Sequence, residues 1–204
     1  MPGGFGYRGV EGMIDAVHYA RENRIPYLGL CLGMQVMVIE AARNLLGKKD
    51  ANSTEFNQDT NNPVIDLMPD QVGVTDKGGT MRLGVYPCEI IGVGVTSKAY
   101  AESDTVILER HRHRFEFNNS FRDQLAAVGL MATGLSPDGN LVEIVEHDGH
   151  PFMAGTQFHP EFLSRPSSPH PMFKEFIRVA CESNGLDVGS TDGINGTSSE
   201  KFVG

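Results

Sequence analysis

The stretch Gly29-Leu30-Cys31-Leu32-Gly33 decides the fold of this 204-residue chain. A short apolar run that begins at Ile25 leads into it, and a longer apolar run with helical periodicity, Met34 to Leu46, follows directly. Gly47 is a typical helix stop. The pattern predicts a strand, a sharp turn and a helix, with Cys31 at the turn.

A cysteine between two glycines at such a junction is a candidate nucleophile. Flanking glycines let the backbone bend tightly, so that the central side chain points outward. The free N–H groups at the start of a helix favour a thiolate, so we expect a lowered pKa for Cys31. The alternative is a buried structural cysteine between core elements.

The rest of the chain alternates between helical and strand patterns. Apolar positions at helical spacing predict a helix over residues 9–22, and the polar stretch 47–63 is typical of a loop. Further strands are predicted near 85–95, 104–109, 126–132, Leu141 to Glu146 and Phe152 to Phe158, the last two as a hairpin through Asp148-Gly149. A final helix is predicted around residues 172–180, after Ser168 and nearby prolines. The alternation indicates an α/β fold.

Composition excludes several classes of function. With 17 basic and 26 acidic residues the formal net charge is −9, which argues against binding to nucleic acid or to anionic membrane surfaces. No apolar run reaches the ~18–20 residues of a membrane span and no secretory signal is evident, so we expect a cytoplasmic protein. The three scattered cysteines favour neither a disulfide framework nor a zinc cluster, and we expect no metal site. Cys88, placed in a loop after Pro87, and Cys181 are interpreted as structural.

A thiol nucleophile needs a base, an orienting carboxylate and donors for an oxyanion. His159 and Glu161 follow a predicted buried strand, and residues two apart in extended backbone share a face. Backbone N–H groups of Gly3-Gly4 and of Leu32 are candidate oxyanion donors. The alternatives are an ordinary His-Pro turn and an ordinary glycine turn.

The segment Arg110-His111-Arg112-His113-Arg114 is the one basic cluster of an acidic chain. Ligand spacing for a metal is absent, and the cluster lacks the interleaved aromatic residues of a nucleic-acid surface. We interpret it as a local site for a small carboxylate, which the fork of an arginine side chain binds well. A solvated charged turn is the alternative.

These motifs occur in an order that resembles one family. Residues 2–6 (PGGFG), 29–35 (GLCLGMQ), 50–56 (DANSTEF), 78–84 (GGTMRLG), 110–118 (RHRHRFEFN) and 157–162 (QFHPEF) together resemble the carboxyl-terminal glutaminase domain of the CTP synthase family, a branch of the class I glutamine amidotransferases. The resemblance covers residues 2–182. It implies a flavodoxin-like α/β fold with a central, mostly parallel sheet and a nucleophile elbow. We expect the first strands of that fold to lie outside the given residues. We expect a domain over 1–182, partial at its amino end, and a disordered tail over 183–204.

The resemblance also implies roles for individual residues. Cys31 would attack the glutamine side-chain amide, His159 would carry the proton, and Glu161 would orient His159. Around the substrate, the resemblance implies an oxyanion hole at Gly4 and Leu32, contacts to the amino acid moiety from Gln35 and Glu55, a carboxylate site at Arg114 and Phe115, and a pocket wall at Gly33 and Met34. A lid that responds to GTP would comprise Gly79, Thr80, Met81, Arg82, Leu83 and Gly84.

The implied reaction is glutamine hydrolysis through a cysteine thioester. The ammonia would serve the ATP-dependent amination of UTP to CTP by an amino-terminal synthetase domain. No phosphate-binding loop motif occurs in these residues, so we expect the synthetase domain to lie outside them. ATP and Mg are expected only in that domain, and this domain would need no cofactor. The full-length enzyme would be a homotetramer with GTP as an allosteric effector.

Two other functions compete with this interpretation. The first is a stand-alone γ-glutamyl cysteine hydrolase of the same architecture, against which the residues Gln35, Glu55 and Arg114 weigh. The second is an inactive truncated fragment that only binds partner subunits. The γ-glutamyl hydrolase is distinguished by whether glutamine or a γ-glutamyl peptide is cleaved. The inactive fragment is distinguished by co-purification with partner subunits without ammonia release.

Overall fold

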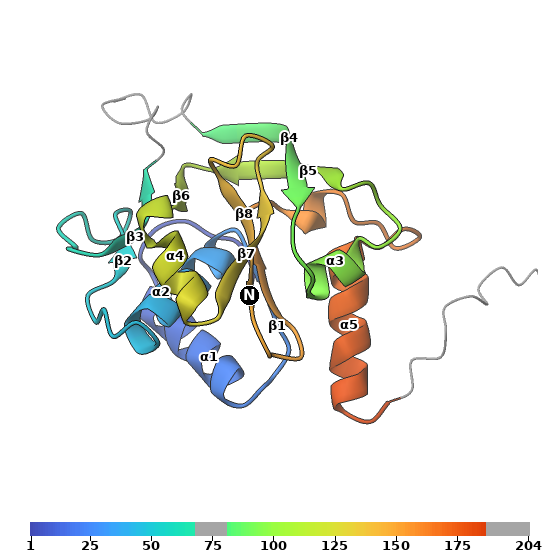
Figure 1. Ribbon diagram of the computed structural model, residues 1–204, viewed down its shortest axis with the longest axis horizontal. Coiled ribbons are helices and arrows are strands. Elements are labelled where there is room, and N and C mark those ends of the chain that lie inside the picture. Colours follow the sequence, from blue (N-terminus) through green and yellow to red (C-terminus); the bar gives the residue numbers. More distant parts are fainter. Residues whose placement is uncertain (68–80, 187–204) are drawn as a thin grey trace, which may run out of the picture.

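The computed structural model describes residues 1–67 and 81–186 of the chain. Its main feature is a six-stranded sheet with the strand order β1-β9-β8-β7-β4-β5, and three short strands form a second sheet in the order β2-β3-β6 (Figure 1). The large sheet contains β1 (Tyr27–Leu30), β4 (Arg82–Ile90), β5 (Val106–His113), β7 (Leu130–Leu135), β8 (Val142–His147) and β9 (Met153–Thr156). The small sheet contains β2 (Asn52–Ser53), β3 (Pro63–Leu67) and β6 (Phe115–Phe117). The helices are α1 (Val10–Glu22), α2 (Leu32–Asn44), α3 (Val95–Ala99), α4 (Arg122–Ala127) and α5 (Pro171–Ser183), with single 3₁₀ turns η2 (Asn119–Phe121) and η3 (Pro160–Phe162).

The large sheet is mixed rather than mostly parallel. Among the described residues, β1 and β9 form its one parallel pair, and every other pair of neighbours is antiparallel. The expectation of a mostly parallel sheet is therefore wrong. Short turns join β7 to β8 and β8 to β9, and a short turn reverses the chain, so these neighbours are antiparallel. A parallel pair needs a long connection, such as the segment between β1 and β9.

Helices cover both faces of the large sheet. Figure 1 shows α1, α2 and α4 on one side and α3 with α5 on the other. Each side has its own apolar core, and β8 contributes to both because successive side chains of a strand point to opposite faces. Val145 packs into the core beneath α1 and α2, whereas its neighbour Ile144 packs into the core that includes α5. The α/β class predicted from the sequence is confirmed.

The first residues of the chain lie along β1. The terminal ammonium of Met1 donates to the carbonyl of Leu28 at 2.8 Å, and the N–H of Leu30 donates to the carbonyl of Met1 at 2.9 Å. These two bonds bring the following Pro-Gly-Gly segment to the end of β1, where α2 begins.

Most predicted elements occur within a few residues of the expected positions, but four details differ. The stretch 126–132 begins in the end of α4 and becomes strand only at Leu130, and the loop predicted over 47–63 includes β2. Cys88 lies in the middle of β4, fully buried, rather than in a loop. The cap of α5 is His170, whose side chain accepts the N–H of Met172, rather than Ser168.

Two expectations concern the ends of the domain and its relation to membranes. None of the helices within 1–67 and 81–186 is long and apolar enough to cross a bilayer. Helix α5 ends at Ser183, and residues 187–204 lie outside the described part of the chain, so the boundary at 182 and the tail stay predictions.

Candidate active site

Cys31 occupies the turn between β1 and α2, as the sequence predicts. Its backbone has φ 51° and ψ −104°, a left-handed conformation that costs a non-glycine residue about 1–3 kcal/mol. The turn is possible because the two elements touch: a Cβ atom on Gly29 would lie 2.5 Å from the carbonyl carbon and oxygen of Gly33. Strain of this kind at a sharp strand-to-helix turn is typical of a nucleophile elbow.

The Cys31 thiol is buried, which changes its protonation. Burial raises the pKa of Cys31 to about 12, and the nearby carboxylates of Glu161, Glu116 and Glu55 add to this, while the N–H of Leu32 opposes it. The lowered pKa expected from the helix start is therefore wrong for this structure, because loss of water outweighs the helix N–H groups. A base must take the proton before the sulfur can attack.

His159 and Glu161 are joined by a direct hydrogen bond. The Nδ1–H of His159 donates to Oε1 of Glu161 at 2.6 Å, and the His159 ring stacks on Phe162 with centroids 4.7 Å apart. Although burial opposes it, the hydrogen bond from His159 holds the pKa of Glu161 below its ordinary value, so Glu161 is a carboxylate that accepts. The proton on Nδ1 leaves Nε2 as the basic nitrogen, and this buried atom has no partner within the described residues.

Gly3 lies against both the His159 ring and Cys31. A Cβ atom on Gly3 would lie 2.9 Å from Cε1 of His159 and 3.4 Å from Cβ of Cys31. Only a residue without a side chain fits between them. The structure thus brings Cys31, His159 and Glu161 together, from the β1–α2 turn and from the segment that follows β9.

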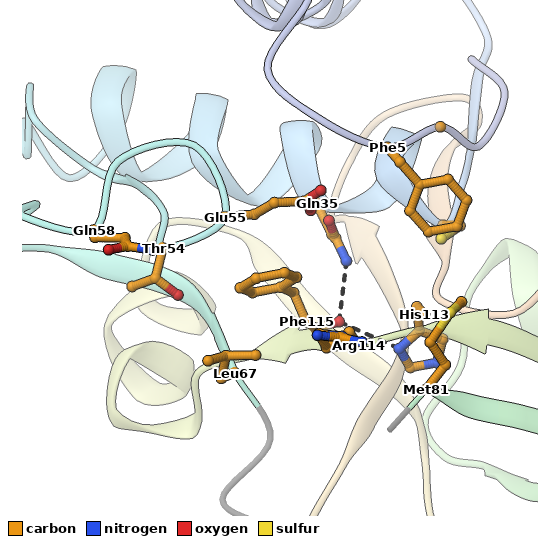
Figure 2. A pocket seen from close by; sticks show the side chains of 12 residues that line it. Phe5, Gln35, Thr54, Glu55, Gln58, Leu67, Met81, His113, Arg114 and Phe115 are labelled. Atoms are coloured by element: carbon orange, nitrogen blue, oxygen red, sulfur yellow. Dashed lines mark hydrogen bonds between the residues drawn. The ribbon is translucent and has the colours of Figure 1, made fainter. Parts of the chain in front are cut away.

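A cavity of about 430 Å³ opens beside Cys31. Figure 2 shows side chains converging on it from the first loop, α2, the segment after β2 and the β5–β6 junction. The predicted substrate residues Gly4, Gln35, Glu55, Arg114 and Phe115 all line it, as does Met81. The cavity therefore has a thiol at one end and charged groups of both signs elsewhere on its wall.

The two charged groups suit a zwitterion. Oε1 of Glu55 accepts the N–H of Gly6 at 2.9 Å, and this bond ties the first loop to the pocket. Burial raises the pKa of Glu55, while the Gly6 bond and the charge of Arg114 oppose the rise. An ammonium group near Glu55 and a carboxylate near Arg114 would each find an opposite charge.

Side-chain amides connect the pocket wall to the nucleophile. Nε2 of Gln35 donates to the carbonyl of Phe115 at 3.1 Å, which Figure 2 marks, and to Oε1 of Gln157 at 3.3 Å. Nε2 of Gln157 in turn donates to Sγ of Cys31 at 3.7 Å. Sequence reasoning missed Gln157, although it stands two residues before His159, where an extended chain would place it on the same face.

The predicted pocket wall needs correction. Met34 is fully buried in the core and packs against Gly155, and the carbonyl of Gly33 accepts the hydroxyl of Tyr27 at 2.7 Å. Neither residue is among those that line the cavity, whereas Gln35, one helical turn after Cys31, is. Leu32 contributes its N–H at the sulfur.

The predicted lid is only partly described. Gly79 and Thr80 lie outside the described residues. Arg82, Leu83 and Gly84 belong to strand β4, paired with β5, rather than to a loop. Arg82 is buried because its Nη1 lies 2.7 Å from Oε1 of Glu143, so this guanidinium binds a carboxylate inside the protein. A response to GTP stays a prediction.

The basic cluster is divided by the alternation of β5. His111 and His113 point inward and are buried, with Nδ1 of one 2.9 Å from Nε2 of the other, whereas Arg110 and Arg112 lie on the exposed face. Burial and the charge of Arg82 lower the pKa of His113 to about 3, so its ring is neutral. The prediction of a five-residue anion site is therefore reduced to Arg114, which alone of the three arginines lines the cavity.

Metal ligands do not gather in this part of the molecule. Within residues 1–67 and 81–186, no three side chains of His, Cys, Asp or Glu lie in an arrangement that could hold a metal ion.

Comparison with known proteins agrees with this geometry. The family model described as glutamine amidotransferase class-I matches residues 1–179. Among curated proteins, the chain is 66% identical over 180 residues to the CTP synthase of Dehalococcoides mccartyi strain BAV1, and 61% identical over 182 residues to that of Herpetosiphon aurantiacus. These alignments cover 88% and 89% of this chain but 33% and 34% of the relatives, so the chain spans about a third of the length of the curated relatives it matches.

One solved structure provides the structural counterpart. The glutaminase domain of Trypanosoma brucei CTPS, with bound acivicin, superposes with a TM-score of 0.84 at 38% identity, over 92% of this chain and 71% of that one. The chain therefore belongs to the class-I glutamine amidotransferase family and, within it, to the glutaminase domains of the CTP synthases.

Proposed function

We propose that this domain hydrolyses the side-chain amide of L-glutamine and releases ammonia, with Cys31 as the nucleophile. One observation carries the proposal: a thiol at a strained turn and a pair of opposite charges, Glu55 and Arg114, line the same cavity. An amino acid whose ammonium and carboxylate groups pair with these charges would extend its side chain toward the sulfur. Membership of the family supports the same substrate.

The first step forms a thioester. Nε2 of His159 takes the proton from Sγ, and the thiolate attacks the amide carbon of glutamine. The carbonyl oxygen becomes an oxyanion, to which we assign the backbone N–H groups of Leu32 and Gly4 as donors. Glu161 accepts from Nδ1 throughout and stabilises the imidazolium.

The second step releases both products. The imidazolium of His159 gives its proton to the amide nitrogen as the C–N bond breaks, so that ammonia leaves and a γ-glutamyl thioester on Cys31 remains. A water molecule, deprotonated by the same imidazole, attacks the thioester carbon. Glutamate leaves and the thiol takes back its proton.

The destination of the ammonia is proposed from the relatives. They are CTP synthases about three times as long as the match, so we assign the ammonia to ATP-dependent amination of UTP to CTP on a synthetase domain. ATP and Mg would bind to that domain, and this one would need no cofactor. A homotetrameric enzyme in the cytoplasm, with GTP as an effector near residues 79–84, completes the proposal.

Ammonia release from L-glutamine tests the proposal. The wild-type chain should release ammonia, Cys31→Ala should abolish release, and Cys181→Ala, a change on α5 far along the chain from the turn, should retain it. Faster turnover of a γ-glutamyl peptide than of glutamine would favour the γ-glutamyl hydrolase instead. If the wild-type chain releases no ammonia yet melts cooperatively by circular dichroism, it is an inactive binding domain.

A further inference from the structure

The Gln157 side chain is hydrogen-bonded to two residues of the cavity wall, Cys31 and Gln35, and the steps above do not use it. It follows β9 directly, its backbone N–H donates to the carbonyl of Glu143 at 2.8 Å, and its side chain has no exposed surface. Both ends of its amide have partners: Nε2 lies 3.7 Å from Sγ of Cys31, and Oε1 lies 3.3 Å from Nε2 of Gln35. This placement puts a buried amide nitrogen within hydrogen-bonding distance of the sulfur.

The direction of these bonds is fixed by a backbone group. A carbonyl oxygen can only accept, so the bond from Gln35 to the carbonyl of Phe115 requires the Gln35 nitrogen at that end. The same nitrogen meets the Gln157 amide, which must therefore present its oxygen. The Gln157 nitrogen then faces Cys31 with an N–H. If the Gln157 amide were turned over, its N–H group would meet the N–H group of Gln35. The sulfur of Cys31 would then face the Gln157 oxygen and lose this donor.

The surroundings of the Cys31 sulfur disfavour its thiolate, so a hydrogen-bond donor to the sulfur would stabilise that form. Burial and the carboxylates of Glu161, Glu116 and Glu55 all oppose a negative charge on Cys31, and within the described residues the N–H of Leu32 acts in the other direction. A hydrogen bond to a charged group is worth more than one to a neutral group, so a bond from an amide to the thiol strengthens as the thiolate forms.

We propose that Gln157 is a further catalytic residue, which donates its Nε2–H to the Cys31 sulfur and stabilises the thiolate during attack. The proton of the thiol goes to Nε2 of His159, and Gln157 neither gains nor loses one. Through its Oε1 it also holds the Gln35 amide, so the Gln35 oxygen is left to face the substrate. This inference rests on the proposed function for its role in turnover, but the contact itself can be tested without glutamine.

Alkylation of Cys31 by iodoacetamide tests the contact. The rate is measured from pH 6 to 10 without glutamine, by mass spectrometry of the peptide that contains Cys31, because only the thiolate reacts. Gln157→Met keeps the volume and removes the donor, and should slow alkylation at a fixed pH by about 10- to 100-fold, the loss expected for a bond to a charged group. Gln157→Glu places a carboxylate there and should slow it further above neutral pH.

The controls separate a catalytic role from a structural one. Gln124→Glu makes the same chemical change on the exposed surface of α4 and should leave alkylation unchanged. Thermal melts are recorded for each variant, so that Gln157→Glu, the smaller change, serves if Gln157→Met fails to fold. A lowered melting temperature with an unaltered alkylation profile in the folded variants would overturn the proposal.

Ammonia release from the same variants distinguishes the two proposals. Gln157→Met should lower kcat about as much as it lowers the alkylation rate. Slower alkylation in a chain that does not hydrolyse glutamine would support the Gln157–Cys31 contact while the proposed function fails. Wild-type hydrolysis and wild-type alkylation in Gln157→Met would leave the proposed function standing and reject the role of Gln157.

Discussion

Substitution of Gly29 by alanine probes the packing that makes the turn at Cys31. The new methyl group would lie 2.5 Å from the carbonyl carbon and oxygen of Gly33 and 2.9 Å from the nitrogen of Met34. All three are backbone atoms of the turn that opens α2, so no side chain can rotate to make room. To reach an ordinary contact of 3.4 Å or more, α2 must shift from β1 by roughly 1 Å.

The expected cost follows from this displacement. Overpacking of a well-packed interior costs about 1–3 kcal/mol, and a rigid backbone neighbour places Gly29→Ala at the upper end. For a chain of this length, about 3 kcal/mol lowers the melting temperature by roughly 6–12 °C. The same shift carries Cys31 away from His159, and a displacement of about 1 Å costs on the order of 100-fold in rate.

Gly12→Ala is the matched control, because the same substitution is expected there to raise the stability of the protein rather than lower it. Gly12 lies in α1 on the exposed side, and a Cβ atom there would meet nothing within 4 Å. Alanine in a helix is more stable than glycine by about 0.5–1 kcal/mol, so its melting temperature should rise by a few degrees. Scanning calorimetry and ammonia release check both variants. A Gly29→Ala protein with wild-type melting temperature and activity would refute the tight packing of β1 on the start of α2.

Three further predictions concern carboxylates. Glu161→Gln should retain the fold and lower kcat for glutamine hydrolysis by about 100-fold or more, because the amide no longer fixes the tautomer of the catalytic imidazole; a smaller loss would contradict the assigned orienting role. Although burial opposes it, the hydrogen bond from Arg21 holds the pKa of Glu40 below its ordinary value of 4.5. The stability that ionised Glu40 adds to the folded protein is therefore fully present above pH 4.5, and it is lost as the pH falls through the lowered pKa. In urea unfolding, the free energy of unfolding of Glu40→Gln should fall furthest below that of wild type near pH 7, and the difference should shrink at acidic pH. Glu55→Gln should speed alkylation of Cys31 in the absence of glutamine, since one opposing charge is gone, while raising KM for glutamine; an unchanged alkylation rate would show that Glu55 does not act on the thiol.

The parts of the fold that could be predicted from the sequence are those that depend on near neighbours. The turn at Cys31 requires small residues on either side, a strand before and a helix after, and all of these lie within about twenty residues. The hairpin of β8 and β9 likewise follows from a local turn signal at Asp148-Gly149. Local chemistry decides these elements, and the pattern therefore predicts them.

The misplaced features depend on partners distant in the chain. His111 and His113 point inward from β5, and they are buried beside Arg82 and Glu143, which come from β4 and β8. The alternating Arg and His residues of the sequence do not reveal those neighbours, and the segment was therefore interpreted as a basic cluster. Gln157 was missed for the same reason, since its importance comes from Cys31, which lies 126 residues earlier.

The protonation of the nucleophile is the clearest case in which the assembled structure reverses a local argument. Taken with its own helix, Cys31 should be a thiolate, but the fold surrounds it with carboxylates and removes water, so that the pKa rises to about 12. The consequence favours specificity. A protonated thiol is a poor nucleophile until a base takes its proton, and the ammonium group of a bound amino acid would neutralise Glu55, one of the carboxylates that oppose the thiolate. We therefore expect a bound amino acid to ease formation of the thiolate, as the Glu55→Gln prediction tests by alkylation.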